Sequence, residues 1–154
     1  MQLFLDCDGV LANFDKRSME IVGMNPREFE DKVGAKNFWK EIYSVPDFFF
    51  SLEPMDDAYQ LVEAVEHLDP IILTGKPRGD WAEGQKLRWR DKYFPKLKMI
   101  VCPSRDKITY AKPGDVIIDD WKKWQKTWVD GGGIWVTHTS AQNSIRELKE
   151  LKII

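Results

Sequence analysis

The chain has 154 residues, which suffices for one domain of ordinary size that carries a small insertion. Its 43% hydrophobic and 31% charged residues exclude a disordered chain, and its net charge of −2 excludes a uniformly basic nucleic-acid binder. The apolar runs are too short to cross a bilayer, and the first residues have no signal-peptide pattern. Cys7 and Cys102 form neither a disulfide framework nor a Cys-x-x-Cys pair. We therefore expect a cytoplasmic globular protein that makes no membrane contact.

Five short apolar runs predict buried parallel strands, each bounded by turn residues or aspartate; in chain order they cover residues 3–5, 71–73, 99–101, 116–118 and 134–136. Helical patterns lie between them over residues 57–67 and 80–93. A last helix follows Ala141, with Leu148 and Leu151 on its apolar face. This alternation predicts a Rossmann-like α/β fold, in which helices cover both faces of a parallel sheet.

The interval between the first two strands, about 65 residues, is too long for one crossover helix. Residues 15–52 combine short helical patterns with a dense aromatic cluster: Phe38, Trp39, Tyr43, Phe48, Phe49 and Phe50. We interpret residues 15–52 as a small helical cap inserted after the first strand, above a catalytic core formed by residues 1–14 and 53–154. A longer crossover with its own aromatic core is a compatible alternative.

Chemically active side chains follow the predicted strands: Asp6 and Asp8, then Thr74 and Gly75, then Lys107, then Asp119 and Asp120. The carboxyl ends of parallel strands meet at one edge of a sheet, and ligands bind there. Any one of these residues alone could be a helix cap or a turn residue. The whole set in this order is better explained as one site.

The residue types favour phosphoryl transfer. The carboxylates of Asp6 and Asp119 are hard oxygen ligands suited to Mg²⁺, and Asp120 could orient the metal shell or bind through water. With a metal neutralising the phosphate, Asp6 could attack it and form an aspartyl-phosphate. Asp8 could protonate the leaving oxygen and later activate water.

The remaining side chains suit the charge of a phosphate. Thr74, the backbone amide of Gly75 and the ammonium of Lys107 could hold the remaining phosphate oxygens and offset their charge.

These residues resemble the four motifs of haloacid dehalogenase-like phosphatases: Asp6-x-Asp8-Gly9-Val10, Thr74, Lys107 and Asp119-Asp120. Over residues 3–120 the chain is also similar to the 5′(3′)-deoxyribonucleotidase branch, through Phe38-Trp39, Phe48-Phe49-Phe50-x-Leu52-Glu53-Pro54, Lys92-Tyr93-Phe94 and Arg105-Asp106-Lys107. The resemblance implies that Asp6 is the nucleophile and Asp8 the general acid and base. It implies that Asp6, the backbone carbonyl of Asp8 and Asp119 hold Mg²⁺.

The chain departs from the usual pattern of that branch at two positions. Thr74-Gly75-Lys76 replaces Thr-Ser-Pro, and Trp121 stands after the acid pair where arginine is common. Both positions adjoin the expected substrate, so they bear on which nucleotide is preferred and not on the reaction type.

The cap aromatics suggest a site for a nucleobase, because stacking a base on an aromatic ring contributes about 1–3 kcal/mol. Phe38, Trp39 and Phe49 are our candidates, while the other aromatic residues form the core of the cap. We expect a Mg²⁺-dependent phosphatase acting on (deoxy)nucleoside monophosphates, with a small nucleotide and not a nucleic acid as its partner.

Two alternatives remain open. One is a 3′-phosphatase acting on nucleic-acid ends, since residues 76–107 carry 10 basic and 4 acidic side chains, a net of +6. Residues 1–70 carry 6 basic and 15 acidic side chains, a net of −9, which disfavours a polyanion. The other alternative is a non-catalytic binding protein on the same fold, against which the complete set of acids and lysine argues.

Three further residue patterns favour structural roles. Trp121, Trp124 and Trp128 have the spacing of a core-facing helical stripe, with Trp121 as the possible exception. His138, after the last strand, is interpreted as a surface or capping residue. Cys7 is expected to point away from the acids on either side of it.

Overall fold

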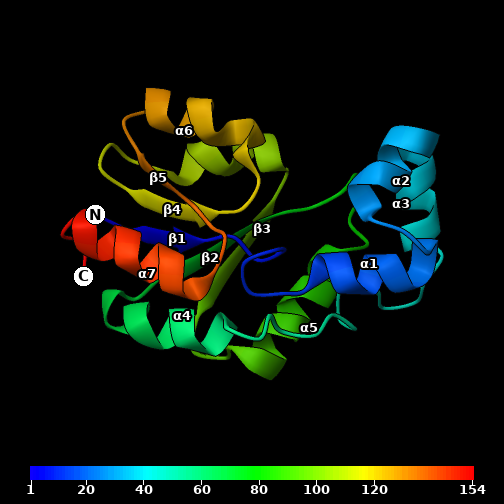
Figure 1. Ribbon diagram of the computed structural model, residues 1–154, viewed down its shortest axis with the longest axis horizontal. Helices are drawn as coiled ribbons and strands as arrows, with labels where there is room; N and C mark the ends of the chain where they lie inside the picture. Colours follow the sequence, from blue (N-terminus) through cyan, green and yellow to red (C-terminus); the bar gives the residue numbers. More distant parts are fainter.

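A computed structural model describes residues 1–154 and shows a five-stranded, wholly parallel sheet (Figure 1). The strand order is β3-β2-β1-β4-β5. The strands are β1 (Leu3–Leu5), β2 (Ile71–Gly75), β3 (Lys98–Cys102), β4 (Val116–Asp119) and β5 (Ile134–Thr137). All five predicted strands and the α/β fold are confirmed.

The strand order places β1 at the centre of the sheet, where the direction of winding reverses. Leu5 pairs with Ile72 of β2 on one side and with Ile118 of β4 on the other. Such a reversal opens a crevice beyond the carboxyl ends of the central strands. The residues that follow β1 therefore lie between the ends of β2 and β4, and the backbone N–H of Asp6 donates to the carbonyl of Ile118 at 2.9 Å.

Helices cover both faces of the sheet (Figure 1). On one face lie α4 (Ala58–Val65), α5 (Glu83–Tyr93) and α7 (Ala141–Glu150); on the other lie α6 (Gln125–Asp130) and the 3-10 helix η2 (Ser104–Tyr110). Two further 3-10 turns, η1 (Glu66–Leu68) and η3 (Lys122–Trp124), complete the chain. Alternation along β1 divides the core, because Leu3 and Leu5 join one buried cluster while Phe4 joins the other. None of these helices has the length and apolar character needed to span a membrane.

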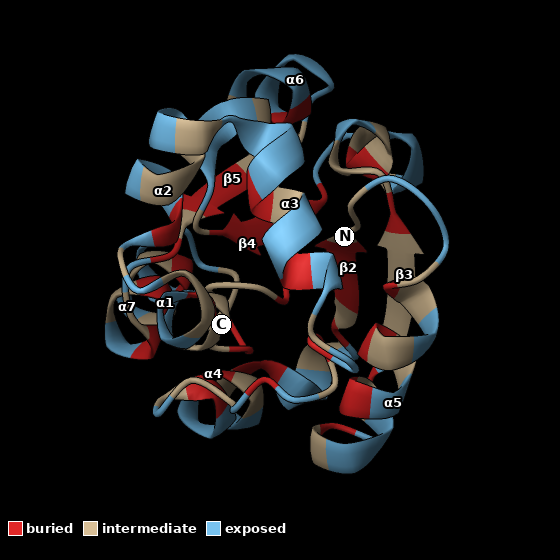
Figure 2. Cartoon of the chain, turned by 90° about the vertical axis from the view of Figure 1, so that its right-hand side faces the viewer, coloured by how far each residue is buried: buried red, intermediate tan, exposed pale blue.

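The segment predicted as a cap contains α1 (Phe14–Val22), α2 (Pro26–Val33) and α3 (Ala35–Tyr43), which lie to one side of the sheet (Figure 1). The side chain of Asn25 accepts the N–H groups of Arg27 and Glu28, and Pro26 occupies the first turn, so the sequence encodes the start of α2. Figure 2 shows these helices in front of the buried strands, with much of their outer surface exposed. The buried rings of this segment, including Phe38 on α3 and Phe48 in the turn after it, belong to the same apolar cluster as Leu5.

Two expected apolar helix faces are wrong in part. Helix α7 ends at Glu150, so Leu148 is fully buried whereas Leu151 is 44% exposed. The three tryptophans share no helix, because α6 begins only after Trp124. Trp128 is buried and packs edge-on against Phe4 with ring centroids 5.8 Å apart, whereas Trp121 is 42% exposed. The cause is local: the backbone N–H of Trp121 donates to the Asp119 carboxylate at 2.9 Å, which turns the chain before a helix can start.

The interpretation of His138 as a surface residue is also wrong. Its backbone N–H donates to the carbonyl of Asp119, which continues the pairing of β5 with β4 toward the protein interior. The imidazole is 6% exposed, and its Nδ1 lies 2.8 Å from the hydroxyl of Ser144 on α7. His138 therefore joins β5 to α7.

Candidate active site

The structure brings together the acids and the lysine that follow different strands. Asp6 comes directly after β1, Asp119 ends β4, and Lys107 lies on η2. The Lys107 ammonium donates to Asp6 Oδ1 and to Asp119 Oδ2, each at 2.9 Å. Burial by itself lowers the pKa of Lys107, but the charges of Asp6 and Asp119 outweigh it, so that the pKa is raised. Lys107 therefore stays protonated and holds the two carboxylates in place.

Three carboxylates form a cluster with the composition of a metal site. Asp6, Asp119 and Asp120 each offer an oxygen, and these oxygens lie within 4.8 Å of one another. Burial, followed by the charge of Asp6, raises the pKa of Asp119 to about 7 and that of Asp120 to about 8. Such crowding marks a place where a divalent cation would offset unfavourable charge, and the all-oxygen donor set fits Mg²⁺.

Two glycines make room for this arrangement. Gly9 has a φ of +82°, and a Cβ there would overlap the carboxylate of Asp120. A Cβ at Gly75 would overlap the hydroxyl of Ser104, which follows β3. A side chain at either glycine would therefore displace a polar group of the site.

Asp8 is set apart from the metal-site cluster. Its Oδ2 accepts a hydrogen bond at 2.7 Å from the ammonium of Lys86, which lies on α5 and is 2% exposed. Burial raises the pKa of the Asp8 carboxyl, although Lys86 acts in the opposite direction. Asp6 and Asp8 are two residues apart in the chain, yet each has a different lysine as its partner: Lys107 for Asp6 and Lys86 for Asp8.

Sequence reasoning missed Lys86. One signal was available, since Lys86 and Trp89 are three residues apart on the predicted helix and so share a face. Trp89 is 1% exposed, and its indole N–H donates to the carbonyl of Leu52. A lysine on the same face as a buried tryptophan needs an acidic partner inside the protein.

The other predicted phosphate-binding residues lie next to the carboxylates. Gly75 and Lys107 line the cavity above the sheet. Thr74 is fully buried beneath it, where its hydroxyl accepts a hydrogen bond from Lys86 at 3.1 Å. Cys7 is buried, and burial raises the pKa of its thiol well above the usual value, so it offers no reactive thiolate.

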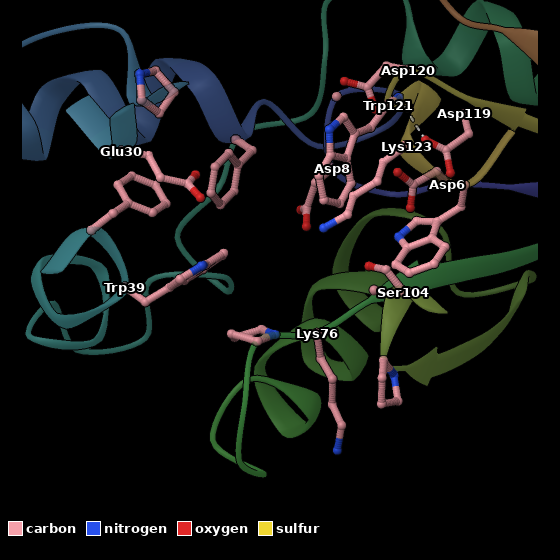
Figure 3. A pocket seen from close by; sticks show the side chains of 18 of the residues that line it. Asp6, Asp8, Glu30, Trp39, Lys76, Ser104, Asp119, Asp120, Trp121 and Lys123 are labelled. Atoms are coloured by element: carbon pink, nitrogen blue, oxygen red, sulfur yellow. Dashed lines mark hydrogen bonds between the residues drawn. The ribbon is translucent and has the colours of Figure 1, made fainter. Parts of the chain in front are cut away.

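The cavity has a volume of about 850 Å³ and lies between the carboxylates at the carboxyl edge of the sheet and the helices of residues 15–52. Figure 3 shows Asp6, Asp119 and Asp120 on one wall, with Glu30 and Trp39 across the gap on the other. All three candidates for a nucleobase site line this cavity, but Phe38 and Phe49 are only 2% and 1% exposed. Trp39 is half-buried and stacks on Phe49 with ring planes 27° apart.

The two walls of the cavity differ in charge. The core side carries the basic side chains Lys76, Arg78, Arg105 and Lys123 in addition to Lys107 and five aspartates. The cap contributes the acids Asp15, Glu30 and Asp31 together with Arg27. Lys76, at one of the two departures from the family pattern, is paired with Asp80 at 3.3 Å and with Glu83 at 3.7 Å. Trp121, at the other departure, is exposed at the cavity edge and lies 5.1 Å from the ammonium of Lys123.

The chain is similar in sequence and in fold to known proteins. The chain is 30% identical over 141 residues to the putative 5′(3′)-deoxyribonucleotidase R824 of Acanthamoeba polyphaga mimivirus, covering 78% of this chain and 63% of that protein. Among solved structures, a hydrolase from Streptococcus pneumoniae TIGR4 superposes with a TM-score of 0.57 at 12% identity, over 99% of this chain and 98% of the other. A haloacid dehalogenase-superfamily hydrolase from Ehrlichia chaffeensis gives 0.56 at 9% identity, over 98% and 97%.

The structural likenesses show the haloacid dehalogenase-like fold. The family described as 5′ nucleotidase, deoxy (pyrimidine), cytosolic type C protein matches residues 1–144, which is nearly the whole chain. On that match the chain belongs to the cytosolic type C deoxy-5′-nucleotidase family.

Proposed function

We propose that this protein is a Mg²⁺-dependent phosphatase that hydrolyses the phosphomonoester of (deoxy)nucleoside monophosphates. The observation that carries the proposal is the position of the acid cluster and Lys107 on one wall of a cavity whose opposite wall is aromatic. Membership of a nucleotidase family supports the same substrate class, and the family description, which names a cytosolic type, supports a cytoplasmic location.

In the first half of the reaction, a carboxylate oxygen of Asp6 attacks phosphorus and forms an aspartyl-phosphate, while the bond to the sugar oxygen breaks. Asp8 gives its proton to that oxygen, so the nucleoside leaves as an alcohol. Lys107 and the amide of Gly75 hold the phosphate oxygens, with Thr74 as a third proposed contact. Bound Mg²⁺ would be held by Asp6, Asp119, Asp120 and the Asp8 carbonyl and would neutralise phosphate charge.

In the second half, Asp8 is the base. It takes a proton from water, whose oxygen attacks the phosphorus of the aspartyl-phosphate. The acyl-phosphate bond breaks, inorganic phosphate leaves, and the Asp6 carboxylate is restored. The same residue thus serves both steps, which requires a carboxyl group that can hold and release a proton.

The cavity fits a single nucleotide. Its volume of about 850 Å³ lies within the range of small-molecule sites, roughly 300–1,000 Å³. With the phosphate against Asp6, the base would reach the cap wall, where we propose contacts with Trp39 and with the edges of Phe38 and Phe49. The aromatic wall would also limit the access of water to the reacting phosphate.

The test is a phosphate-release assay on deoxynucleoside and ribonucleoside monophosphates and on sugar phosphates, with Mg²⁺ and with excess EDTA. We expect turnover of the deoxynucleotides that requires Mg²⁺. Asp6→Asn should abolish it while the protein stays folded, since an amide is a poor nucleophile, and Asp8→Asn should lower the rate by about 10²–10⁴-fold. Wild-type turnover by Asp6→Asn contradicts the covalent mechanism, and full activity in EDTA contradicts the metal.

A second candidate function is dephosphorylation of nucleic-acid 3′ ends. The basic side chains Lys76, Arg78, Arg105 and Lys123 favour it, because they could contact a phosphate backbone. The salt bridges of Lys76 and the neighbouring acids of the cavity weaken that contact.

A further inference from the structure

A buried lysine outside the cavity contacts the proposed general acid. Lys86 on α5 is 2% exposed and does not line the cavity. Its ammonium donates to Asp8 Oδ2 at 2.7 Å and to the hydroxyl of Thr74 at 3.1 Å, and it lies 4.3 Å from the centre of the Phe49 ring. Besides Lys107, it is the only lysine buried in the protein.

The ammonium is engaged inside the protein and does not reach the cavity. It carries three N–H donors and no acceptor, and two donors are taken by Asp8 and Thr74. The face of the Phe49 ring covers its remaining side as a cation–π partner. Lys86 thus differs from Lys107, which lines the cavity.

The contact makes the two oxygens of Asp8 inequivalent. Oδ2 is fixed by Lys86, whereas Oδ1 is buried and has no hydrogen-bond partner in the protein. Asp8 itself lines the cavity. A carboxyl anchored through one oxygen keeps a single rotamer, and this side chain is 26% exposed where it lines the cavity.

We propose that Lys86 is a positioning residue for the proton transfers of Asp8, a role that rests on the proposed phosphatase function. It holds the carboxyl in one orientation at the cavity, where the leaving alcohol would lie. Lys86 makes no contact with the phosphate and acts only through Asp8. A misplacement of about 1 Å in such a group can lower a rate about 10²-fold.

The leaving group distinguishes this role from a structural one. A nucleoside must receive a proton to leave, whereas the nitrophenolate of p-nitrophenyl phosphate is stable as an anion and leaves without one. The kcat/KM value reports the transfer of phosphate to Asp6 and not the later hydrolysis. Lys86→Met should lower kcat/KM about 10²-fold on a deoxynucleoside monophosphate, and less than about threefold on p-nitrophenyl phosphate.

Three variants complete the experiment. Asp8→Asn should show the same dependence on the leaving group. The double variant Asp8→Asn, Lys86→Met should be no slower on the nucleotide than Asp8→Asn, because residues acting as a unit are not additive. It also carries no unpaired buried charge, so it keeps the test open if Lys86→Met does not fold. Lys92→Met, an exposed lysine of the same helix, should match the wild type.

Equal losses on both substrates would overturn the proposal, since they would place Lys86 on the phosphate or the fold. So would unchanged nucleotide turnover, or a double variant much slower than Asp8→Asn. If the wild type hydrolyses other alkyl phosphates but no nucleotide, only the nucleotide assignment fails, and the comparison is made on that alkyl phosphate. A wild type inactive on every alkyl phosphate overturns both.

Discussion

Two adjacent carboxyl groups, Asp119 and Asp120, have raised pKa values, about 7 and about 8, because both are buried near the charge of Asp6. When the pKa of an acid is higher in the folded than in the unfolded protein, the free energy of unfolding falls as the pH rises toward the folded-state pKa. Asp119 and Asp120 should therefore make the metal-free protein less stable at pH 9 than at pH 6. Ionised carboxylates are also what Mg²⁺ requires.

We therefore predict that Mg²⁺ raises the thermal unfolding midpoint more at pH 9 than at pH 6. Thermal unfolding with Mg²⁺ or with EDTA at each pH measures the difference. Asp120→Asn is the control and should reduce both the Mg²⁺ effect and its pH dependence. An equal Mg²⁺ shift at both pH values would show that these carboxyls are not the metal ligands.

A second prediction at this scale separates substrate contact from core packing among the cap aromatics. Trp39 is half-buried at the cavity, whereas Phe38 is 2% exposed and packs between Phe14, Phe29 and Trp39. Trp39→Ala should raise KM for deoxynucleotides with a smaller effect on kcat. Phe38→Ala should lower the free energy of unfolding by about 3–5 kcal/mol, because it leaves a cavity.

Steady-state kinetics and urea unfolding of both variants test this separation. The prediction fails if Trp39→Ala leaves KM unchanged, which would make Trp39 a packing residue as well.

At the scale of single elements, α7 shows how a helix end decides which residues stabilise the protein. Leu148 lies within α7 and is fully buried, whereas Leu151 follows the last helical residue and is 44% exposed. Leu148→Ala should cost about 2–5 kcal/mol of unfolding free energy. Leu151→Ala, the matched control, should change it by less than about 0.5 kcal/mol. Comparable losses in urea unfolding would mean that the C-terminal residues pack more tightly than this structure shows.

Helix α5 has the widest set of roles of any single element. Its residues Gln85, Lys86 and Trp89 reach Phe49, Asp8 and Leu52 respectively. The first and third contacts hold the segment that closes the cap, and the second holds the proposed general acid. One face of α5 thus contacts both the segment of Phe49 and Leu52 and the residue Asp8 that follows β1.

At the scale of the whole molecule, the cavity between cap and sheet determines which substrates fit. A nucleotide can occupy about 850 Å³. A nucleic-acid strand is longer and would have to leave the cavity past the acidic side chains of the cap, which repel its phosphates. The first 70 residues, which include the cap, carry a net charge of −9. We predict that a 3′-phosphorylated oligonucleotide is a much poorer substrate, by kcat/KM, than a deoxynucleoside monophosphate.

Competing the two substrates at low and high salt provides the measurement. Contacts to a strand's phosphates release counterions, so oligonucleotide turnover should fall steeply with salt if the basic side chains of the cavity bind it. An oligonucleotide that is the better substrate and shows that salt dependence would replace the nucleotidase proposal with the 3′-phosphatase.

Much of the fold was predictable from local pattern. Short apolar runs bounded by aspartate identified all five strands, because a strand buried on both faces leaves a continuous apolar signal. The convergence of Asp6, Lys107 and Asp119 followed from the expected parallel direction of the strands, since parallel strands end at one edge. These inferences needed no knowledge of distant contacts.

The tryptophan stripe and His138 were not predictable in this way. Helical spacing does not predict a hydrogen bond between a side chain and the backbone, such as the one that the Asp119 carboxylate accepts from the N–H of Trp121. The burial of His138 depends on α7 packing beside β5, which brings Ser144 to its ring.

The strands and the chemical character of the residues that follow them were readable from the sequence, because these depend on neighbours along the chain. Which groups pair depends on the tertiary fold. Lys86 and Asp8 are 78 positions apart, and the spacing of Lys86 to Trp89 could place the lysine on an inner helix face without identifying its partner. The same holds for Phe38, Trp39 and Phe49, because their exposure depends on how the cap packs over the sheet.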